Sequence, residues 1–221
     1  MKPLISVIVP TRGRVTRLDA MLNSLWRTVA QSDHVEVVIR CDVDDLPTLN
    51  YLVGKGITFL AGSHLDGYVT LASFINQAAR ASSGEIVLVI NDDAEFVTPG
   101  WDTALIKATE QFPDGVYDIG VNTIMNNENF VFPCTSRRMV NLIGVHEERL
   151  IYNDIWLRDV MLAFDRAVHV PDITIRHDWV GMTPDQQRAL QIVQTPAYEQ
   201  LYAQCVREAQ DKIRSLSWGQ S

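Results

Sequence analysis

The chain has 221 residues, of which 47% are hydrophobic, and a formal net charge of −8. This length fits one compact domain or one domain with an appendage, and the excess of acid argues against broad, non-specific nucleic-acid binding. The three cysteines (Cys41, Cys134, Cys205) lie far apart without a CxxC motif, which argues against a zinc site or disulfide framework and favours a reducing cytoplasm.

The first hundred residues alternate between strand and helix patterns. Continuous apolar runs predict four buried strands, at residues 4–9, 35–39, 57–61 and 86–90. Apolar residues at helical spacing predict three helices between them, at residues 15–29, 46–54 and 69–81. Strands that alternate with helices indicate an α/β fold in which a mostly parallel sheet is covered on both faces.

The rest of the chain is less regular. It predicts a helix at 101–112, short strands and loops at 116–146, a helix at 153–163, a strand at 168–175, and a polar amphipathic helical segment at 184–216, interrupted near Pro196. We therefore expect one α/β domain over residues 1–183, with halves of about 1–100 and 101–183, and a helical tail at 184–221. With no apolar run of 18 residues and no signal-peptide pattern, we expect no transmembrane segment.

Three polar segments, "PTRGR", "RCDVDD" and "NDDAEF", follow predicted strands. In open parallel sheets, ligands bind at the carboxyl ends of the strands, so these segments should meet in space. Asp92 and Asp93 suit a hard divalent cation and a sugar hydroxyl, although a solvated turn with a helix cap is an alternative. Asp42 is a candidate ligand for a nucleobase or ribose, and Asp44 and Asp45 are candidate caps for the helix near Leu46.

Three further features permit both a functional and a structural interpretation. Asp154 is either a general base or a helix N-cap. His177 follows the last predicted strand and fits a metal or phosphate role, or a structural one. Arg12 and Arg14 could face a diphosphate or line a solvated loop, because neither GxxxxGK[ST] nor GxGxxG is present.

Several segments, in order, resemble the family 2 glycosyltransferases of the GT-A fold. "ISVIVPTRGRVTRLDAMLNSL" resembles the opening strand, Pro-Thr turn and first helix of that family, and "EVVIRCDVDD" resembles its second strand. "NQAARASSGEIVLVINDDAEF" is similar to the family stretch that ends in the acidic motif. "YNDIWLRDV" resembles the segment that carries the base, and "IRHDWVGMT" resembles a late His-containing element. The match covers about residues 3–183.

The resemblance implies a role for each matching residue. Thr11 and Asp42 would contact the nucleoside, Asp92 the ribose, and Asp154 would be the general base. Mn²⁺ or Mg²⁺ would be bound by Asp93, with His177 completing its shell. The implied donor-binding residues are Pro10, Thr11, Arg12, Arg14, Asp42, Asn76, Asn91 and Asp92. Residues 1–100 would then form the nucleotide-sugar half and residues 101–183 the acceptor half.

The sequence departs from the family pattern at three positions. Asn91 stands where the family has the first acid of its acidic motif, which places metal binding mainly on Asp93. Ile75 precedes Asn76 where the family often has arginine, so a diphosphate contact would come from Arg12 or Arg14. Asn153 replaces the glutamate that usually precedes the base.

The predicted function is a metal-dependent, inverting transfer of sugar from a nucleotide sugar, most simply a UDP-sugar, to an acceptor hydroxyl. Glycan, lipid-linked sugar, protein and modified nucleobase remain open as acceptors, the last through a local patch such as Arg137-Arg138. The compact size and the acidic charge argue somewhat against a lipid-linked acceptor. The alternatives are a nucleotidyltransferase, which usually carries a Gly-rich, Lys-containing loop that "PTRGR" lacks, and a non-catalytic nucleotide-sugar-binding module.

Overall fold

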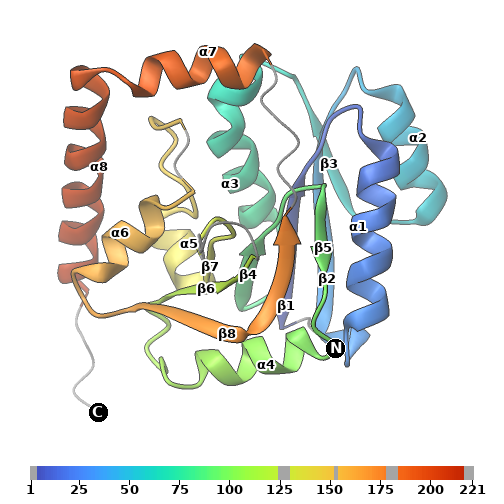
Figure 1. Ribbon diagram of the computed structural model, residues 1–221, viewed down its shortest axis with the longest axis horizontal. Coiled ribbons are helices and arrows are strands. Elements are labelled where there is room, and N and C mark those ends of the chain that lie inside the picture. Colours follow the sequence, from blue (N-terminus) through green and yellow to red (C-terminus); the bar gives the residue numbers. More distant parts are fainter. Residues whose placement is uncertain (1–3, 124–129, 152–153, 178–183, 217–221) are drawn as a thin grey trace.

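A five-stranded sheet forms the centre of the protein (Figure 1). Its order is β3–β2–β1–β4–β7. The strands β1 (Ile5–Pro10), β2 (Val35–Asp42), β3 (Phe59–Gly62) and β4 (Ile86–Val89) run parallel, and β7 (Cys134–Ser136) pairs antiparallel with β4. The expected α/β fold with a mostly parallel sheet is therefore confirmed. We describe it from a computed structural model, for residues 4–123, 130–151, 154–177 and 184–216.

Helices cover both faces of this sheet. One face packs against α1 (Val15–Thr28) and α2 (Leu46–Lys55), and the other against α3 (Leu71–Ala81) and α5 (Arg137–Ile143). The apolar cluster of the first face also includes α4 (Trp101–Thr109). Successive side chains of a strand point to opposite faces, so an apolar run serves both layers. Strand β1, which is buried except at Pro10, shows this directly, because Val7 and Val9 join the first layer while Ile8 joins the second.

A smaller sheet, β5–β8–β6, extends the centre. Its strands are β5 (Ala94–Phe96), β6 (Asp118–Asn122) and β8 (Ala167–His177), with β8 antiparallel to β5 and parallel to β6. The register of β6 and β8 shifts beside Pro171, which has no N–H to donate to a ladder. The sequence pattern predicted neither β5 nor α5. β5 is only three residues long, and it is held by pairing with a strand about 80 residues away, including the cross-strand ion pair of Glu95 and Arg176.

The C-terminal helices pack against the second half of the domain. The structure contains α6 (Trp156–Leu162), α7 (Pro184–Val193) and α8 (Pro196–Arg214), and Thr195 caps α8 at the expected interruption. Short 3-10 turns, η1 (Ser32–His34) and η2 (Gly67–Thr70), complete the described elements. A separate apolar cluster joins α6 to α8 through Trp156, Cys205 and Ile213, among others. In Figure 1, α7 lies beside the top of α3.

A buried acid in β6 makes a testable prediction about stability. Asp118 is fully buried, and burial raises its pKa to about 7 because the charged form is disfavoured. Its Oδ1 accepts a hydrogen bond from the N–H of Cys134, but Oδ2 has no partner among the described residues. The folded state therefore retains a proton that the unfolded chain releases above a pKa of about 4.

The free energy of unfolding should fall as pH rises from about 4 to about 7, and level off above that. Asp118→Asn keeps the oxygen that accepts from Cys134 and carries no charge. At pH 8 we expect it to be more stable than wild type by about 2–4 kcal/mol, and at pH 4.5 to differ little. Urea unfolding at pH 4.5, 6 and 8 measures this difference. A difference that does not vary with pH would contradict the prediction.

Candidate active site

The polar segments after β1 and β4 meet as the sequence predicts. Thr11 follows β1, and its Oγ1 donates a hydrogen bond of 2.7 Å to Oδ2 of Asp92. Asp92 is fully buried. Burial raises its pKa to about 6, against the opposing effects of Arg14 and the Thr11 hydroxyl. Its Oδ1 lies 3.0 Å from the Arg14 guanidinium. A buried carboxylate is costly without such partners, so this interaction ties the β1–α1 segment to the end of β4.

The carboxylate of Asp93 lies beside two arginine side chains and one histidine side chain. Its Oδ2 is 3.1 Å from Arg14 and 3.3 Å from Arg17, and its Oδ1 is 3.3 Å from Nε2 of His177. Burial opposes ionisation, but the hydrogen bond from His177 and the charge of Arg14 hold the pKa of Asp93 below its usual value. Nε2 of His177 also lies 3.2 Å from the amide nitrogen of Asn91. The structure therefore brings Asn91, Asp93 and His177 together.

A second charged group lies at the end of β2. Asp42 is buried and accepts from Nη1 of Arg12 and contacts Nδ1 of His64, both at 2.7 Å, while Arg40 lies 3.2 Å from its other oxygen. The side chains of Arg12 and His64 are about 40% exposed. They therefore lie between solvent and the buried carboxylate of Asp42, with nitrogen atoms that a ligand can reach. A ligand that bonds Asp42 directly must displace Arg12 or His64.

The two acids after Asp42 have separate roles. Asp45 caps α2 as expected, accepting from the N–H of Thr48, and it also accepts from the N–H of Gly13. The expectation that Asp44 caps the helix is wrong. Its side chain is exposed and forms a two-bond pair with Arg12, which lowers the pKa of Asp44 to about 2. The guanidinium group of Arg12 is therefore held in place by two carboxylates, those of Asp42 and Asp44.

The side chain of Asn76, for which the resemblance implies a donor contact, is bonded to a loop of the protein. It is buried in α3, and its amide oxygen accepts from the N–H groups of Val145 and His146. Its amide nitrogen donates to the carbonyl of His146 at 2.8 Å and lies 3.1 Å from Glu148. Asn76 therefore holds the loop that follows α5. Pro10, by contrast, is the last residue of β1, next to Thr11.

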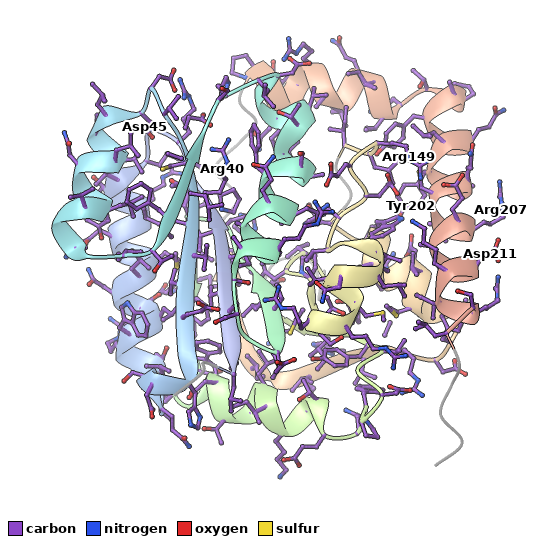
Figure 2. The ribbon with its side chains drawn as sticks, turned by 180° about the vertical axis from the view of Figure 1, so that it is seen from behind. Arg40, Asp45, Arg149, Tyr202, Arg207 and Asp211 are labelled. Atoms are coloured by element: carbon purple, nitrogen blue, oxygen red, sulfur yellow. The ribbon has the colours of Figure 1, made fainter. Side chains whose placement is uncertain are left out.

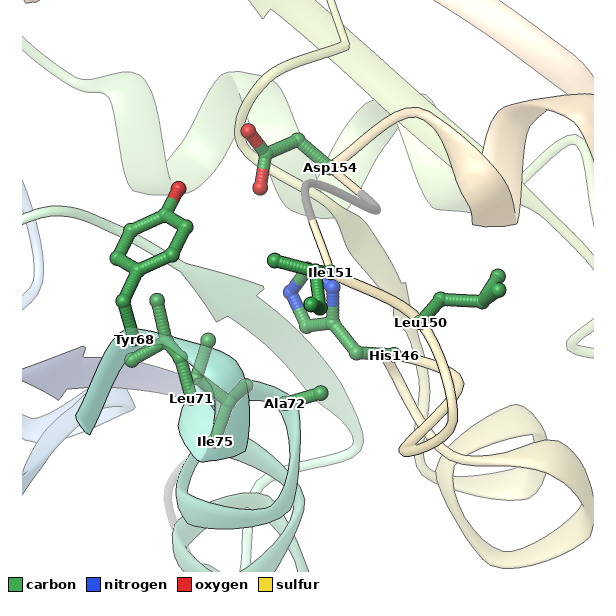
Figure 3. A pocket seen from close by; sticks show the side chains of 8 residues that line it. All are labelled: Tyr68, Leu71, Ala72, Ile75, His146, Leu150, Ile151 and Asp154. Carbon is green, nitrogen blue, oxygen red and sulfur yellow. The ribbon is translucent and has the colours of Figure 1, made fainter. Parts of the chain in front are cut away.

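Asp154 lines a small cavity between η2, α3 and the loop before α6 (Figure 3). The other lining residues are Tyr68, Leu71, Ala72, Ile75, His146, Leu150 and Ile151. The cavity encloses about 20 Å³, room for about one water molecule. Figure 3 shows the carboxylate of Asp154 and the hydroxyl of Tyr68 directed into the same space. The alternative of an N-cap is not supported, because α6 begins at Trp156 without a side-chain cap.

The pair Arg137-Arg138 does not form a free basic patch. Arg137 is half-buried and donates to the carbonyls of Ala79 and Gly84 and to Oγ of Ser82, at the carboxyl end of α3. Arg138 donates to the carbonyl of Asp114. These bonds tie α5 to the edge of the sheet where β4 begins, opposite the carboxyl ends. The observation removes the one local feature that favoured a nucleobase acceptor.

Sequence reasoning did not identify Arg17, His64, Tyr68 and His146 as site residues. A signal for Arg17 was present, because Arg14 and Arg17 are three residues apart at the start of a predicted helix and so share one face. The two histidines and Tyr68 have no such signal, because their partners are 22 or more residues away or are brought near by the fold. The rest of the late element "IRHDWVGMT", from residue 178 to residue 183, lies outside the described residues.

The fold is that of known glycosyltransferases. A mannosyltransferase from Pyrobaculum calidifontis, solved with GDP-mannose and Mn²⁺, superposes with a TM-score of 0.66 at 15% identity, over 97% of this chain and 74% of that one. Residues 1–349 of TarS from S. aureus, solved with UDP, give 0.59 at 17% identity, over 98% and 73% of the chains. Glucosyl-3-phosphoglycerate synthase from Mycobacterium tuberculosis, solved with UDP, gives 0.60 at 12%, over 95% and 80%. The expected GT-A fold is thereby confirmed.

Two proteins also match in sequence. An uncharacterised protein, y4gI, of Sinorhizobium fredii is 28% identical in an alignment of 153 residues, which covers 59% of this chain and 16% of that protein. The O-antigen biosynthesis protein RfbC of Myxococcus xanthus is 30% identical over 115 residues, 49% of this chain and 8% of that protein. The matched regions are thus small parts of both relatives. No family model matches the sequence.

The position of Asn76 leads to a prediction. Asn76→Ala removes three buried hydrogen bonds to the backbone of Val145 and His146, so it should lower the free energy of unfolding by about 2–4 kcal/mol. Because the amide of Asn76 is already bonded within the protein, we expect the Kd for UDP to stay within about twofold of wild type. Denaturant unfolding and calorimetry with UDP measure the two effects.

Asn23→Ala is the matched control, since Asn23 is an exposed amide that bonds only Asp19 within its own helix. It should leave both quantities unchanged. Weaker UDP binding by the Asn76 variant without a loss of stability would return Asn76 to the donor site.

Proposed function

We propose that the protein is a glycosyltransferase that moves a sugar from a nucleotide sugar, a UDP-sugar in its simplest form, to an acceptor hydroxyl. The observation that carries this proposal is the convergence of Thr11, Asp92, Asp93 and His177 at the carboxyl end of a GT-A sheet. In open α/β sheets this edge is where ligands bind. Structural neighbours that carry UDP or GDP-mannose support the same class of donor.

The charges of this edge suit a nucleoside diphosphate. Arg12, Arg14 and Arg17 have side chains that are 42–46% exposed, so their guanidinium groups can reach a ligand while bonded to acids below them. Arginine binds phosphate through two parallel N–H groups, which also fixes orientation. In this proposal Asp42 and Arg12 face the base, Asp92 faces the ribose, and Arg14 and Arg17 face the phosphates.

The pair Asp93 and His177 fits a divalent cation. No three His, Cys, Asp or Glu side chains gather as a metal cluster within the described ranges. That agrees with how Mg²⁺ is usually held beside nucleotides, by one or two protein ligands with phosphate oxygens and water completing the shell. Oδ1 of Asp93 and Nε2 of His177, 3.3 Å apart, are a hard oxygen and an imidazole nitrogen, both suitable for Mn²⁺.

When bound, such a cation supplies Lewis-acid stabilisation of the charge that develops on the leaving diphosphate. The residues around it then exchange partners. Without a ligand, Arg14 and Arg17 neutralise Asp92 and Asp93. If a cation neutralised Asp93, the guanidinium groups that face Asp93 would be available to the phosphates. Nη2 of Arg14 faces Asp92 and Nη1 faces Asp93, so Nη1 can turn to a phosphate while Nη2 stays beside the buried carboxylate of Asp92.

Asp154 acts as the general base in this proposal. Its carboxylate removes the proton from the acceptor hydroxyl as the oxygen attacks the anomeric carbon on the face opposite the diphosphate. The C1–O bond to the acceptor forms while the bond to the diphosphate breaks, and a single displacement inverts the configuration. The small cavity beside Tyr68 and His146 has room for about one water-sized group, so the hydroxyl oxygen of an acceptor fits beside the carboxylate.

Acceptor and location remain proposals. A glycan or a protein hydroxyl is the acceptor class that we retain, because Arg137 and Arg138, which favoured a nucleobase, are bonded to main-chain carbonyls of the protein. The cytoplasmic location rests on the cysteines, which are free, buried thiols in the structure. No helix in the described part of the chain is both long and apolar enough to cross a membrane.

Metal binding is tested with Asp93→Asn. Wild type should gain about 2–3 kcal/mol of stability from UDP with Mn²⁺ at about a hundredfold excess over Kd, and less from UDP alone. The variant lacks the anionic oxygen, so Mn²⁺ should add nothing to the effect of UDP. Asp114→Asn is the control, because Asp114 forms an equally close ion pair, with Arg166, at the opposite edge of the sheet. A thermal-shift series with both variants measures this.

An unchanged Mn²⁺ effect in the Asp93 variant would remove the metal assignment. Binding of UDP by wild type with no transfer to any acceptor would instead support the non-catalytic alternative. Consumption of a sugar phosphate and a nucleoside triphosphate with release of pyrophosphate would support the nucleotidyltransferase.

The base is tested with Asp154→Asn. Loss of the carboxylate should lower kcat for transfer by about 10²–10⁴-fold, since this is the usual contribution of general-base catalysis. The Kd for the UDP-sugar should not change, because Asp154 contacts the acceptor side. Transfer assays with calorimetry separate the two quantities. A variant with wild-type kcat would exclude Asp154 as the base.

A further inference from the structure

One hydroxyl of α8 holds both main-chain groups of a residue in the loop before α6. The hydroxyl of Tyr198 accepts a hydrogen bond of 3.0 Å from the N–H of Ile151 and donates to the carbonyl of the same residue. Burial raises the pKa of Tyr198, so the hydroxyl keeps its proton and stays a donor. Ile151 is thus fixed from the C-terminal helix.

The same loop has further tethers to α8. Arg149 is 2.7 Å from both Glu147, in its own loop, and Glu208, on α8. Figure 2 shows Arg149 beside this helix. Leu150 is buried in the apolar cluster that contains Cys205 and Ile213 of α8. Three consecutive residues, 149–151, are therefore positioned by α8 through an ion pair, an apolar contact and a pair of hydrogen bonds.

These tethers surround the cavity in which Asp154 lies. Ile151 forms part of its wall, and Asp154 is close enough to Tyr198 for its charge to raise the pKa of that hydroxyl. On the other side of Asp154, Trp156 is fully buried in the cluster shared with α8. Both flanks of the carboxylate thus depend on contacts with the same helix.

We propose that Tyr198 is a positioning residue for the transfer reaction, which sets the location of the Asp154 carboxylate by clamping Ile151. This inference rests on the proposed role of Asp154 as the base. A general base must lie within hydrogen-bond reach of the acceptor hydroxyl, and a misplacement of about 1 Å can cost about a hundredfold in rate. According to this proposal, the C-terminal helix α8 helps to form the acceptor side of the active site.

Tyr202 supplies a matched comparison on the same helix. It lies one turn beyond Tyr198, is half-buried, and its hydroxyl donates 2.8 Å to Oδ2 of Asp159 in α6. Tyr202→Phe therefore removes one hydroxyl of α8 without touching the bonds of Ile151. Tyr198→Phe removes the clamp and keeps the ring. A purely structural role predicts similar effects of the two changes, whereas a positioning role predicts different ones.

The first readout is kinetic. Tyr198→Phe should lower kcat for transfer by about 10- to 100-fold. The KM for the donor and the Kd for UDP should both stay within about twofold of wild type, because the donor edge is not altered. Tyr202→Phe should keep kcat within about twofold. A Tyr198 variant with wild-type kcat, or an equal loss of kcat in both variants, would overturn the proposal.

The second readout does not depend on activity. Hydrogen exchange of peptides that cover residues 144–151 should be faster in Tyr198→Phe than in wild type, and unchanged in Tyr202→Phe. Unchanged exchange in the Tyr198 variant would overturn the clamp, whatever the activity of the wild type. If exchange is faster in Tyr198→Phe but wild type transfers no sugar, the clamp on Ile151 is supported and only the proposed function is contradicted.

Discussion

The buried carboxylate of Asp92 is the constraint on which the donor side of the structure depends. A carboxylate with no exposed surface requires partners close by, and both of its partners, Thr11 and Arg14, come from the segment between β1 and α1. That requirement sets how the end of β1 approaches the end of β4. Arg14 also reaches Asp93, so one guanidinium links the buried acid to the partly exposed one that faces His177.

The two sides of the proposed active site are held by different kinds of interaction. Charges dominate the donor side, where Arg12, Arg14 and Arg17 lie against acids and stay exposed enough to bind phosphate. On the acceptor side, the loop that leads to Asp154 is fixed mainly by neutral hydrogen bonds, from Asn76 at one end and Tyr198 at the other. Salt screens exposed charges more than buried hydrogen bonds, so the two sides differ in their response to ionic strength.

Patterns within short stretches of sequence were reliable guides to the structure. The apolar runs predicted the parallel strands because burial on both faces leaves little choice of residue. Asp45 was predicted as a helix cap from the residues next to it. The prediction that Asp44 caps a helix was wrong, because its partner, Arg12, lies 32 residues away. The loop partners of Asn76, Val145 and His146, lie about 70 residues away, so its sequence neighbours did not indicate them.

The sequence by itself determined the sheet, its helical layers and the edge where Asp42, Asp92 and Asp93 come together, because hydrophobic periodicity and the rule for carboxyl ends act locally. Only the tertiary structure decided which charges pair there, that Arg17 and His64 join them, and that β5 forms. It also decided that α8 clamps the loop beside Asp154. These features depend on contacts between distant segments, whose geometry is set by packing and is not encoded in any one stretch of residues.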